Sequence, residues 1–145
     1  MDKMEIRKAT KKDIKIISKI FREGYSEEPY NENWSEKIAN ERMKNDLKTE
    51  EIFVLEDNNQ IIGFVTLTSY LWHTGLRGFI HEIVIGEEFR GKGYGKKLME
   101  FAELRFKEIG AKEIQLITSP KSKAYQIYKK LNYIDEGFIT MYKVI

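Results

Sequence analysis

Hydrophobic and polar residues follow regular patterns from the start of the chain, and these patterns predict its first elements. Residues 4–9 alternate between apolar and polar side chains, which predicts a strand. Thr10 and Asp13 have the spacing of a capping box, so we expect a helix that opens there and ends at Gly24. The apolar stripe of this helix recurs at helical spacing and consists of Ile14, Ile17, Ile20 and Phe21.

A polar and aromatic loop over residues 25–33 separates this helix from a second one. The second helix is predicted to start at Trp34 or Ser35 and to run to about Lys48. Two runs rich in β-branched residues follow and are typical of a hairpin. They cover residues 51–56 and 60–72 and are joined by the turn Asp57-Asn58-Asn59.

The centre of the chain combines a strand with a long helix. Residues 79–85 are rich in β-branched and aromatic side chains, which predicts a buried strand. A helix is predicted to begin at Tyr94 and to stop at Gly110. Its apolar positions recur with helical spacing at Leu98, Ala102, Phe106 and Ile109.

The last third of the chain predicts four more elements. They are a strand over residues 113–118, a helix over 121–131, and two closing strands over 133–134 and 138–142. The resulting order, β-α-α-β-β-β-α-β-α-β-β, indicates an α/β (α+β mixed) fold: a mixed central sheet with helices on both faces. No repeat or linker interrupts it, so we expect a single domain over residues 1–145.

Three glycines, Gly91, Gly93 and Gly95, lie between the central strand and the long helix. Glycine lets a backbone approach a ligand closely, and a helix start offers unpaired N–H groups with about half a positive charge. This combination predicts a phosphate site. Neither a P-loop nor a dinucleotide fingerprint fits, because the glycines are evenly spaced and Lys96 is followed by Lys97 instead of Ser or Thr.

Composition narrows the function classes. The 25 Lys and Arg residues nearly balance the 23 Asp and Glu residues, so neither a nucleic acid nor an anionic membrane is expected as a partner. The absence of cysteine excludes a thiol nucleophile and a disulfide framework, and two histidines make a zinc site improbable, so no metal is expected. No apolar run reaches transmembrane length and the amino terminus does not resemble a signal peptide, so we expect a cytoplasmic protein.

The run Arg90-Gly91-Lys92-Gly93-Tyr94-Gly95 resembles the acetyl-CoA signature Arg/Gln-x-x-Gly-x-Gly/Ala of the GNAT superfamily of N-acetyltransferases. The predicted order of elements is also similar to the GNAT fold. The resemblance implies acetyl-CoA as the cofactor, with its pyrophosphate on backbone amides of the glycine loop and its pantetheine arm along the backbone of the central strand. The cofactor-binding residues implied in this way are Ile83, Val84, Ile85, Arg90, Gly91, Lys92, Gly93, Tyr94, Gly95 and Lys96.

Residues 127–133 resemble the family pattern Leu-Tyr-x-x-x-Gly-Phe. The resemblance implies that Tyr128 stands near the coenzyme sulfur and protonates the leaving thiolate. The alternative is that Tyr128 is only a core side chain. Lys121 stands where the family often has Asn, and Asn132 stands where it often has Gly. Asn tolerates the left-handed conformation that a helix end can require, so we expect the fold to be unaffected.

Two residues of the central strand are candidates for the base that deprotonates the amine. His81 and Glu82 are adjacent, so their side chains should point to opposite faces unless a bulge intervenes. The resemblance favours His81, whereas Glu82 could act through a chain of waters. The alternative for each is a side chain that is only packed or paired at the sheet surface.

The loop after the first helix is acidic and aromatic, which suits a cationic amine. A solvated acidic loop is the alternative. Residues 28–34 also resemble a pattern in members of the family that acetylate small molecules. The candidate substrate residues are Glu28, Tyr30, Glu32 and Trp34.

We therefore expect an N-acetyltransferase that joins acetyl-CoA and a primary amine of a small molecule or peptide in one ternary complex, because no cysteine can carry an acetyl group. The alternative is a module that binds acyl-CoA without turnover, as a regulator. A nucleic-acid-binding domain has only local support, from Lys92, Lys96, Lys97, Lys129 and Lys130. The sequence leaves open whether the chain forms a homodimer.

Overall fold

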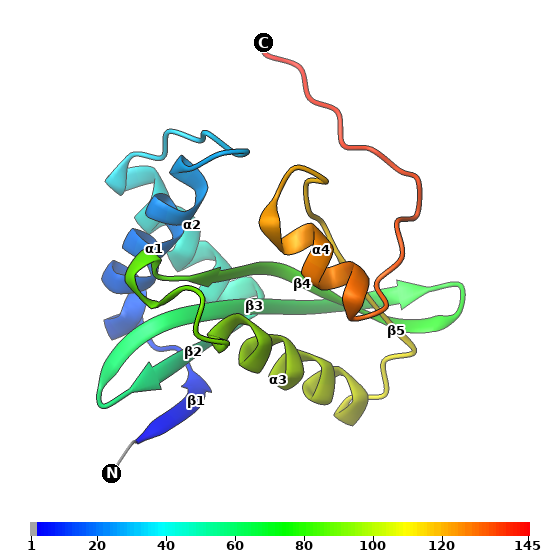
Figure 1. Ribbon diagram of the computed structural model, residues 1–145, viewed down its shortest axis with the longest axis horizontal. Coiled ribbons are helices and arrows are strands. Elements are labelled where there is room, and N and C mark those ends of the chain that lie inside the picture. The colour runs from blue at the N-terminus through cyan, green and yellow to red at the C-terminus, as the bar shows by residue number, and fades with distance from the viewer. Residues whose placement is uncertain (1–2) are drawn as a thin grey trace.

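A computed structural model describes residues 3–145 and contains one mixed sheet flanked by helices (Figure 1). The sheet has five strands in the order β1-β2-β3-β4-β5, namely β1 (Met4–Lys8), β2 (Glu51–Asp57), β3 (Gln60–Trp72), β4 (Gly75–Ile85) and β5 (Glu113–Leu116). The helices are α1 (Ile14–Ser26), α2 (Glu36–Thr49), α3 (Tyr94–Glu108) and α4 (Lys123–Lys130), with short 3₁₀ turns η1 (Lys11–Asp13) and η2 (Glu87–Phe89). Among the described residues, no helix is both long enough and apolar enough to cross a bilayer.

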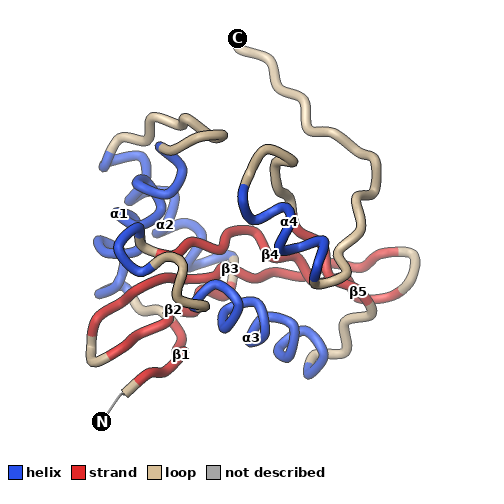
Figure 2. The backbone as a smooth tube through the Cα atoms, viewed as in Figure 1, coloured by secondary structure: helices blue, strands red, loops and turns tan. Residues whose placement is uncertain are grey.

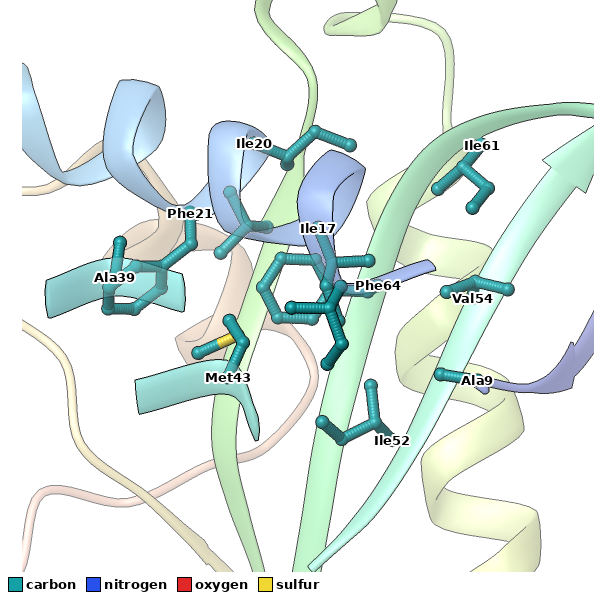
Figure 3. Close-up of a cluster of buried hydrophobic side chains, with 12 residues drawn as sticks. Ala9, Ile17, Ile20, Phe21, Ala39, Met43, Ile52, Val54, Ile61 and Phe64 are labelled. Atoms are coloured by element: carbon teal, nitrogen blue, oxygen red, sulfur yellow. The ribbon is translucent and has the colours of Figure 1, made fainter. Parts of the chain in front are cut away.

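The sheet separates two hydrophobic clusters. In the tube view the strands lie between helices α1 and α2 on one side and α3 on the other (Figure 2). On one face, α1 and α2 pack Ile17, Phe21 and Met43 against buried strand residues such as Phe64 (Figure 3). On the other face, α3 packs its apolar stripe against the sheet, and Tyr128 and Leu131 join this cluster from the α4 region. The predicted fold class, a mixed sheet with helices on both faces, is confirmed.

Strand β4 is paired over its full length on one side only. Its antiparallel pairing with β3 runs from Gly75 to Ile85. Its parallel pairing with β5 covers only Arg77 to Ile80, opposite Glu113 to Leu116. The backbone of residues 81–85 therefore has one edge that no other described strand occupies. Free N–H and C=O groups at such an edge can bind an extended ligand.

A β-bulge interrupts β4 just where this pairing ends. Thr66 of β3 is opposite Glu82, and the next residue, Leu67, is opposite Ile80. His81 is thus the extra residue of the bulge. Bulges re-aim side chains and recur beside active sites. The exception that the sequence left open, a bulge at these two adjacent candidates, is present.

The amino-terminal elements agree with the sequence patterns in detail. Thr10 and Asp13 form the predicted capping box, and Asp13 also accepts two hydrogen bonds from Arg7, at 2.9 and 3.0 Å. Ser35 caps α2 by accepting from the backbone of Ile38 at 3.1 Å. The predicted end of α1 at Gly24 was wrong, because the helix continues to Ser26.

Gly24 has a packing role instead of a terminating one. A Cβ built on Gly24 would lie 2.7 Å from Cγ1 of Val84, which is too close for real atoms. The glycine therefore lets α1 approach β4, on the same stretch of strand that carries the candidate site.

The carboxyl-terminal third differs from the prediction. Strand β5 ends at Leu116 and α4 starts at Lys123, where the Ser122 hydroxyl accepts from the Tyr125 amide at 3.3 Å. The two closing strands predicted over residues 133–134 and 138–142 were wrong, because the described chain after Lys130 contains no strand or helix. Asn132 does adopt the left-handed conformation expected of it, with φ of 71°.

Gly24→Ala and Gly95→Ala form a matched pair that tests the packing role of Gly24. Both glycines are helical, but the nearest atom to a Cβ on Gly95 would be Cγ1 of Ile85 at 3.9 Å, an ordinary contact. We expect Gly24→Ala to lower the free energy of unfolding by about 1–3 kcal/mol through overpacking. Gly95→Ala should leave it unchanged or raise it, as helix propensity favours. Denaturant unfolding measures both, and equal effects would contradict this packing role.

Candidate active site

The glycine loop that follows β4 is shaped as a backbone cradle. Gly91 and Gly93 have φ of 75° and 85°, a left-handed conformation that glycine adopts without strain. No atom of the described residues lies within 4 Å of a Cβ built on either one. Gly93 is the N-cap of α3, and the first helical hydrogen bond runs from Lys97 N–H to its carbonyl at 3.2 Å. The amides just before Lys97 therefore lack helical partners and can bind an anion.

The basic side chains around this cradle differ in the partners that they contact. Arg90 donates from Nε to the Ile85 carbonyl at 3.1 Å and from Nη1 to Glu27 at 2.6 Å. Lys92 is exposed, and Lys96 is 4.0 Å from Glu100 across one turn of α3. The roles of Arg90, Lys92 and Lys96 at a pyrophosphate therefore stay predictions, and Arg90 would have to leave Glu27 to take that role.

The unpaired edge of β4 leads from this cradle toward the candidate base. Ile83, Val84 and Ile85 lie along it, and the short turn η2 connects them to the glycine loop. The side chains of Ile83 and Ile85 pack against the α3 face and that of Val84 against the α1 face. Their side chains are thus ordinary core, and only their backbone groups are available to a ligand, as the sequence analysis expected.

The bulge places both base candidates on the side of α2. Nη2 of Arg42 is 3.0 Å from Nε2 of His81 and 3.3 Å from Oε1 of Glu82. The remaining carboxylate oxygen of Glu82, Oε2, is buried, and it has no hydrogen-bond partner among the described residues. An acceptor that is buried and unpaired is available for a proton from a ligand.

The contacts of His81 fix its neutral tautomer. Arginine has only donors, so Nε2 of His81 must accept from Arg42. The ring proton then resides on Nδ1, which donates to the Glu50 carboxylate at 2.9 Å. The Glu50 carboxylate raises the pKa of His81, while burial and the charge of Arg42 act less strongly in the opposite direction. In neutral His81 both ring nitrogens are thus engaged by protein groups, and Nε2, the nitrogen that takes up a proton, faces Arg42.

Asp46, Glu50 and His81 are also the one group of described side chains with the spacing of a metal site, since their ligand atoms lie within 4.8 Å of one another. Arg42 already donates to Asp46 at 2.9 Å and to His81. A guanidinium cation thus takes the place that a metal ion would need, and we interpret the group as an ion-pair network.

Three tyrosines surround Glu82 from different elements. Burial raises the pKa of Tyr25, which lies on α1, and the nearby charge of Glu82 raises it further. Burial raises the pKa of Tyr128 on α4 to about 12, with smaller contributions from Tyr30 and Glu82. Burial also raises the pKa of Glu82, although the Tyr25 hydroxyl, which is near the carboxylate but forms no full hydrogen bond with Oε2, and the His81 and Arg42 charges favour the carboxylate. The Glu82 carboxyl group thus lies in the region where four segments come together: β4, α1, the loop after α1, and α4.

The family model described as acetyltransferase (GNAT) family matches residues 14–133, which is most of the chain. The chain belongs to the GNAT family. This confirms the resemblance, and family membership supports the predicted enzyme class of N-acetyltransferase and the predicted cofactor, acetyl-CoA.

A probable glucosamine 6-phosphate N-acetyltransferase of Drosophila melanogaster is 28% identical over 88 residues, which are 57% of this chain and 39% of that protein. The chain thus spans less than half the length of this relative. A possible acetyltransferase from Clostridium difficile 630 has the same fold, with a TM-score of 0.84 and 18% identity over 98% of both chains. A predicted acetyltransferase from Clostridium acetobutylicum, solved with acetyl-CoA, has a TM-score of 0.77 and 23% identity, covering 97% of this chain and 96% of its own.

The four candidate substrate residues of this GNAT protein lie in different settings. Tyr30 packs edge-on against Tyr25, with ring centroids 4.9 Å apart, and so belongs to the tyrosine group. Trp34 packs against Phe21 of the core and donates from its indole to Glu32 at 2.6 Å. Glu28 and Glu32 are exposed. The structure thus brings Tyr30 to Tyr25 and into the neighbourhood of Tyr128, whereas Trp34 is largely a packing residue.

Sequence reasoning missed the part of the site that α2 contributes. Arg42, Asp46 and Glu50 all lie at the His81 side of Glu82, and their i, i+4 spacing on one helix was the only local signal. That spacing predicts an exposed ion pair on a helix as readily as a site. Their contacts with β4 join residues 31 to 40 positions apart in the chain.

Glu50→Gln tests the assignment of the His81 tautomer. Because Glu50 raises the folded-state pKa of His81, its stabilising effect is fully present below the ordinary histidine pKa of about 6.5 and is lost as the pH rises through the folded value. Wild type should therefore be more stable than Glu50→Gln by a margin that is larger at about pH 5.5 than at about pH 9. Denaturant unfolding measures the margin, and NMR should find a lower His81 pKa in the variant. A margin independent of pH would contradict the assignment.

Proposed function

We propose that this GNAT protein transfers the acetyl group of acetyl-CoA directly to a primary amine of a small molecule, in a ternary complex with Glu82 as the base. One observation carries the proposal. Glu82, whose carboxylate has one buried and unpaired oxygen, and the half-buried Tyr128 are near enough for the charge of Glu82 to raise the pKa of Tyr128, and Glu82 is on the unpaired edge of β4 that leads to the helix-start cradle. Base, acid and anion cradle are thus supplied along one line by β4 and its neighbours.

The cradle and the unpaired edge of β4 bind acetyl-CoA and orient its thioester. The amides at the start of α3 suit a pyrophosphate, and the free backbone groups of residues 83–85 suit an amide-containing arm. Bound acetyl-CoA supplies an activated thioester. By holding it against the amine, these groups turn a bimolecular reaction into an effectively unimolecular one, which can supply much of the rate enhancement.

Glu82 accepts the amine proton. An amine with a pKa near 10.4 is neutral in only about one molecule in a thousand at pH 7, so a base is needed. Burial raises the pKa of Glu82 from its ordinary 4.5, which makes its carboxylate a stronger base. His81 suits this role less, because its Nδ1–H faces Glu50 and its Nε2 faces Arg42. His81 and Arg42 instead position the Glu82 carboxylate.

The Tyr128 hydroxyl acts as the hydrogen-bond donor to the leaving sulfur. As the N–C bond forms, the C–S bond breaks, and the electron pair stays on sulfur as a thiolate. With a pKa of about 12, the Tyr128 hydroxyl is protonated throughout the physiological range and is always available as a donor. An ordinary thiol has a pKa near 8.5, so Tyr128 first stabilises the thiolate by a hydrogen bond. A protonated amine loses two protons in all: Glu82 passes the first to solvent before attack, and the second, lost from nitrogen after the N–C bond forms, is equivalent to the proton that the thiolate finally takes.

The acceptor is proposed to be a small, polar amine. The relative from Drosophila is named for glucosamine 6-phosphate, which is such an amine. Tyr30 lies close to Tyr128, and the exposed carboxylates Glu28 and Glu32 lie on the same loop, so a cationic acceptor would meet favourable charge. Peptide acceptors are the alternative within the same chemistry.

The deciding experiment follows coenzyme A release from acetyl-CoA with a panel of amines that includes glucosamine 6-phosphate, a diamine and a lysine-containing peptide. We expect turnover with a small amine. Glu82→Gln should lower kcat by roughly 10²–10⁴-fold and remove the acidic limb of the pH profile, while His81→Gln should lower kcat less. Acetyl-CoA binding without turnover of any amine would favour the regulatory module. A larger loss in His81→Gln would contradict Glu82 as the base.

Tyr128→Phe and Tyr125→Phe form the matched test of the acid. Both residues lie on α4, but Tyr125 contacts Lys129, with the ammonium 5.4 Å from the ring centroid, and has no place in the proposed reaction. Removing the Tyr128 hydroxyl should lower kcat by roughly 10²-fold or more with acetyl-CoA affinity retained, whereas Tyr125→Phe should leave kcat unchanged. Equal turnover of the two variants would mean that Tyr128 is only a core side chain.

A further inference from the structure

The single guanidinium of Arg42 contacts three acceptors on two different elements. Its Nε donates to Asp46, one turn further along α2, at 2.9 Å. Its Nη2 faces β4, where it is 3.0 Å from Nε2 of His81 and 3.3 Å from Oε1 of Glu82. The contact with Glu82 is the longest of the three, and an arginine side chain has many rotamers. A further constraint is therefore needed to keep the guanidinium turned toward Glu82 as well as toward Asp46.

Two aromatic rings supply this constraint. Cζ of Arg42 is 5.5 Å from the ring centroid of Phe21 and 5.8 Å from that of Trp34. The two rings pack edge to face, with their centroids 4.8 Å apart. The cation thus lies in the corner between two rings, and the quadrupole of each ring attracts it. Phe21 is fully buried and Trp34 only partly, so Trp34 forms the outer wall of this corner.

The loop between α1 and α2, residues 27–35, in turn holds Trp34 in place. The backbone N–H of Glu32 donates to a carbonyl in the last turn of α1 at 2.8 Å. The carboxylate of Glu32 accepts a hydrogen bond from the indole of Trp34 at 2.6 Å. Contacts therefore run without a break from Glu32 through Trp34 to Arg42, and from there to Glu82.

We propose that Trp34 is a positioning residue that holds the Arg42 guanidinium against Glu82, so that the loop between α1 and α2 helps to place the base. The inference rests on the proposed function, in which Glu82 is that base. Without the indole, the guanidinium relaxes toward Asp46, its nearer carboxylate, and away from Glu82. Burial raises the pKa of Glu82 and the charge of Arg42 opposes this increase, so the relaxation raises this pKa further.

The direction of the change separates positioning from two simpler roles of Trp34. Removing a side chain that only packs would admit water, and reduced burial lowers the pKa of a carboxyl group. Withdrawal of a cation raises that pKa instead. A side chain that only contacts the acceptor would raise the KM for the amine and leave the pH profile of kcat in place.

The first test compares pH profiles of kcat with a small amine. Trp34→Leu should move the acidic limb upward by about half a pH unit or more, since a close arginine can lower a carboxyl pKa by roughly 1–3. Trp34→Phe keeps a ring and should move it less. Trp72→Leu is the matched control, because Trp72 lies 5.0 Å from Cζ of Arg77, which pairs with other carboxylates, and the limb should stay in place. A limb that stays or moves downward in Trp34→Leu, or moves equally in Trp72→Leu, would overturn the proposal.

The second test is an NMR titration of His81, which requires no turnover. The chain has two histidines, so His81→Gln assigns the signal. The Glu50 carboxylate raises the pKa of His81, and the charge of Arg42 opposes this increase. Trp34→Leu should therefore raise this pKa in the wild-type background and leave it unchanged in the Arg42→Gln background, where there is no guanidinium to move. Equal changes in both backgrounds, which water entry alone would produce, contradict the proposal.

The two tests also keep this inference distinct from the proposed function. If no amine is turned over, or if Glu82→Gln keeps its kcat, the proposed function fails, but the His81 titration still reports whether Trp34 positions Arg42. Circular dichroism checks that each variant folds. The pH profiles need no variant of Arg42, so they decide the matter if Arg42→Gln does not fold.

Discussion

The loss of pairing between β4 and β5 after Ile80 is the constraint on which the candidate site depends. Up to that residue β4 is an interior strand, and beyond it one edge of its backbone is free. The bulge at His81 lies at this transition. A bulge adds one residue without moving the flanking pairs far. The bulge at His81 therefore turns the side chains of His81 and Glu82 toward α2, while β4 continues toward the glycine loop. The free edge and the re-aimed side chains are thus two consequences of the same interruption.

Burial of Glu82 at this point requires compensation, because an isolated buried carboxylate is costly. Arg42 supplies it from α2, where its guanidinium also lies 5.5 Å from the ring centroid of Phe21. The same arginine also donates to Asp46. The pairing is incomplete, since only Oε1 of Glu82 contacts Arg42. A fully paired carboxylate would be more stable and less basic, so the unpaired oxygen is the feature that suits catalysis.

Most of the fold could be predicted because its signals are local. The capping box at Thr10, the helical stripe after Tyr94 and the turn at Asn132 each depend on residues within a few positions of one another. Gly24 misled the prediction, because a glycine that ends a helix and a glycine that admits Val84 look alike in sequence. Residues 138–142 are rich in aromatic and β-branched side chains, as strands are, but whether a strand forms depends on a free edge elsewhere. The α2 network was missed for the same reason, since its partners are far apart in the chain.

The start of α3 departs from the rule that the other helices of this chain follow. Ser35 and Ser122 cap α2 and α4, and a capping box precedes α1. Such caps contribute about 0.5–2 kcal/mol each. Among the described residues no side chain caps α3, and Gly93 holds its N-cap position. The lack of a side-chain cap lowers the stability of α3 and leaves N–H groups of its first turn without partners. A chain that caps its other helices gives up this stabilisation where an anionic ligand can replace the cap, so the start of α3 is adapted to binding more than to folding.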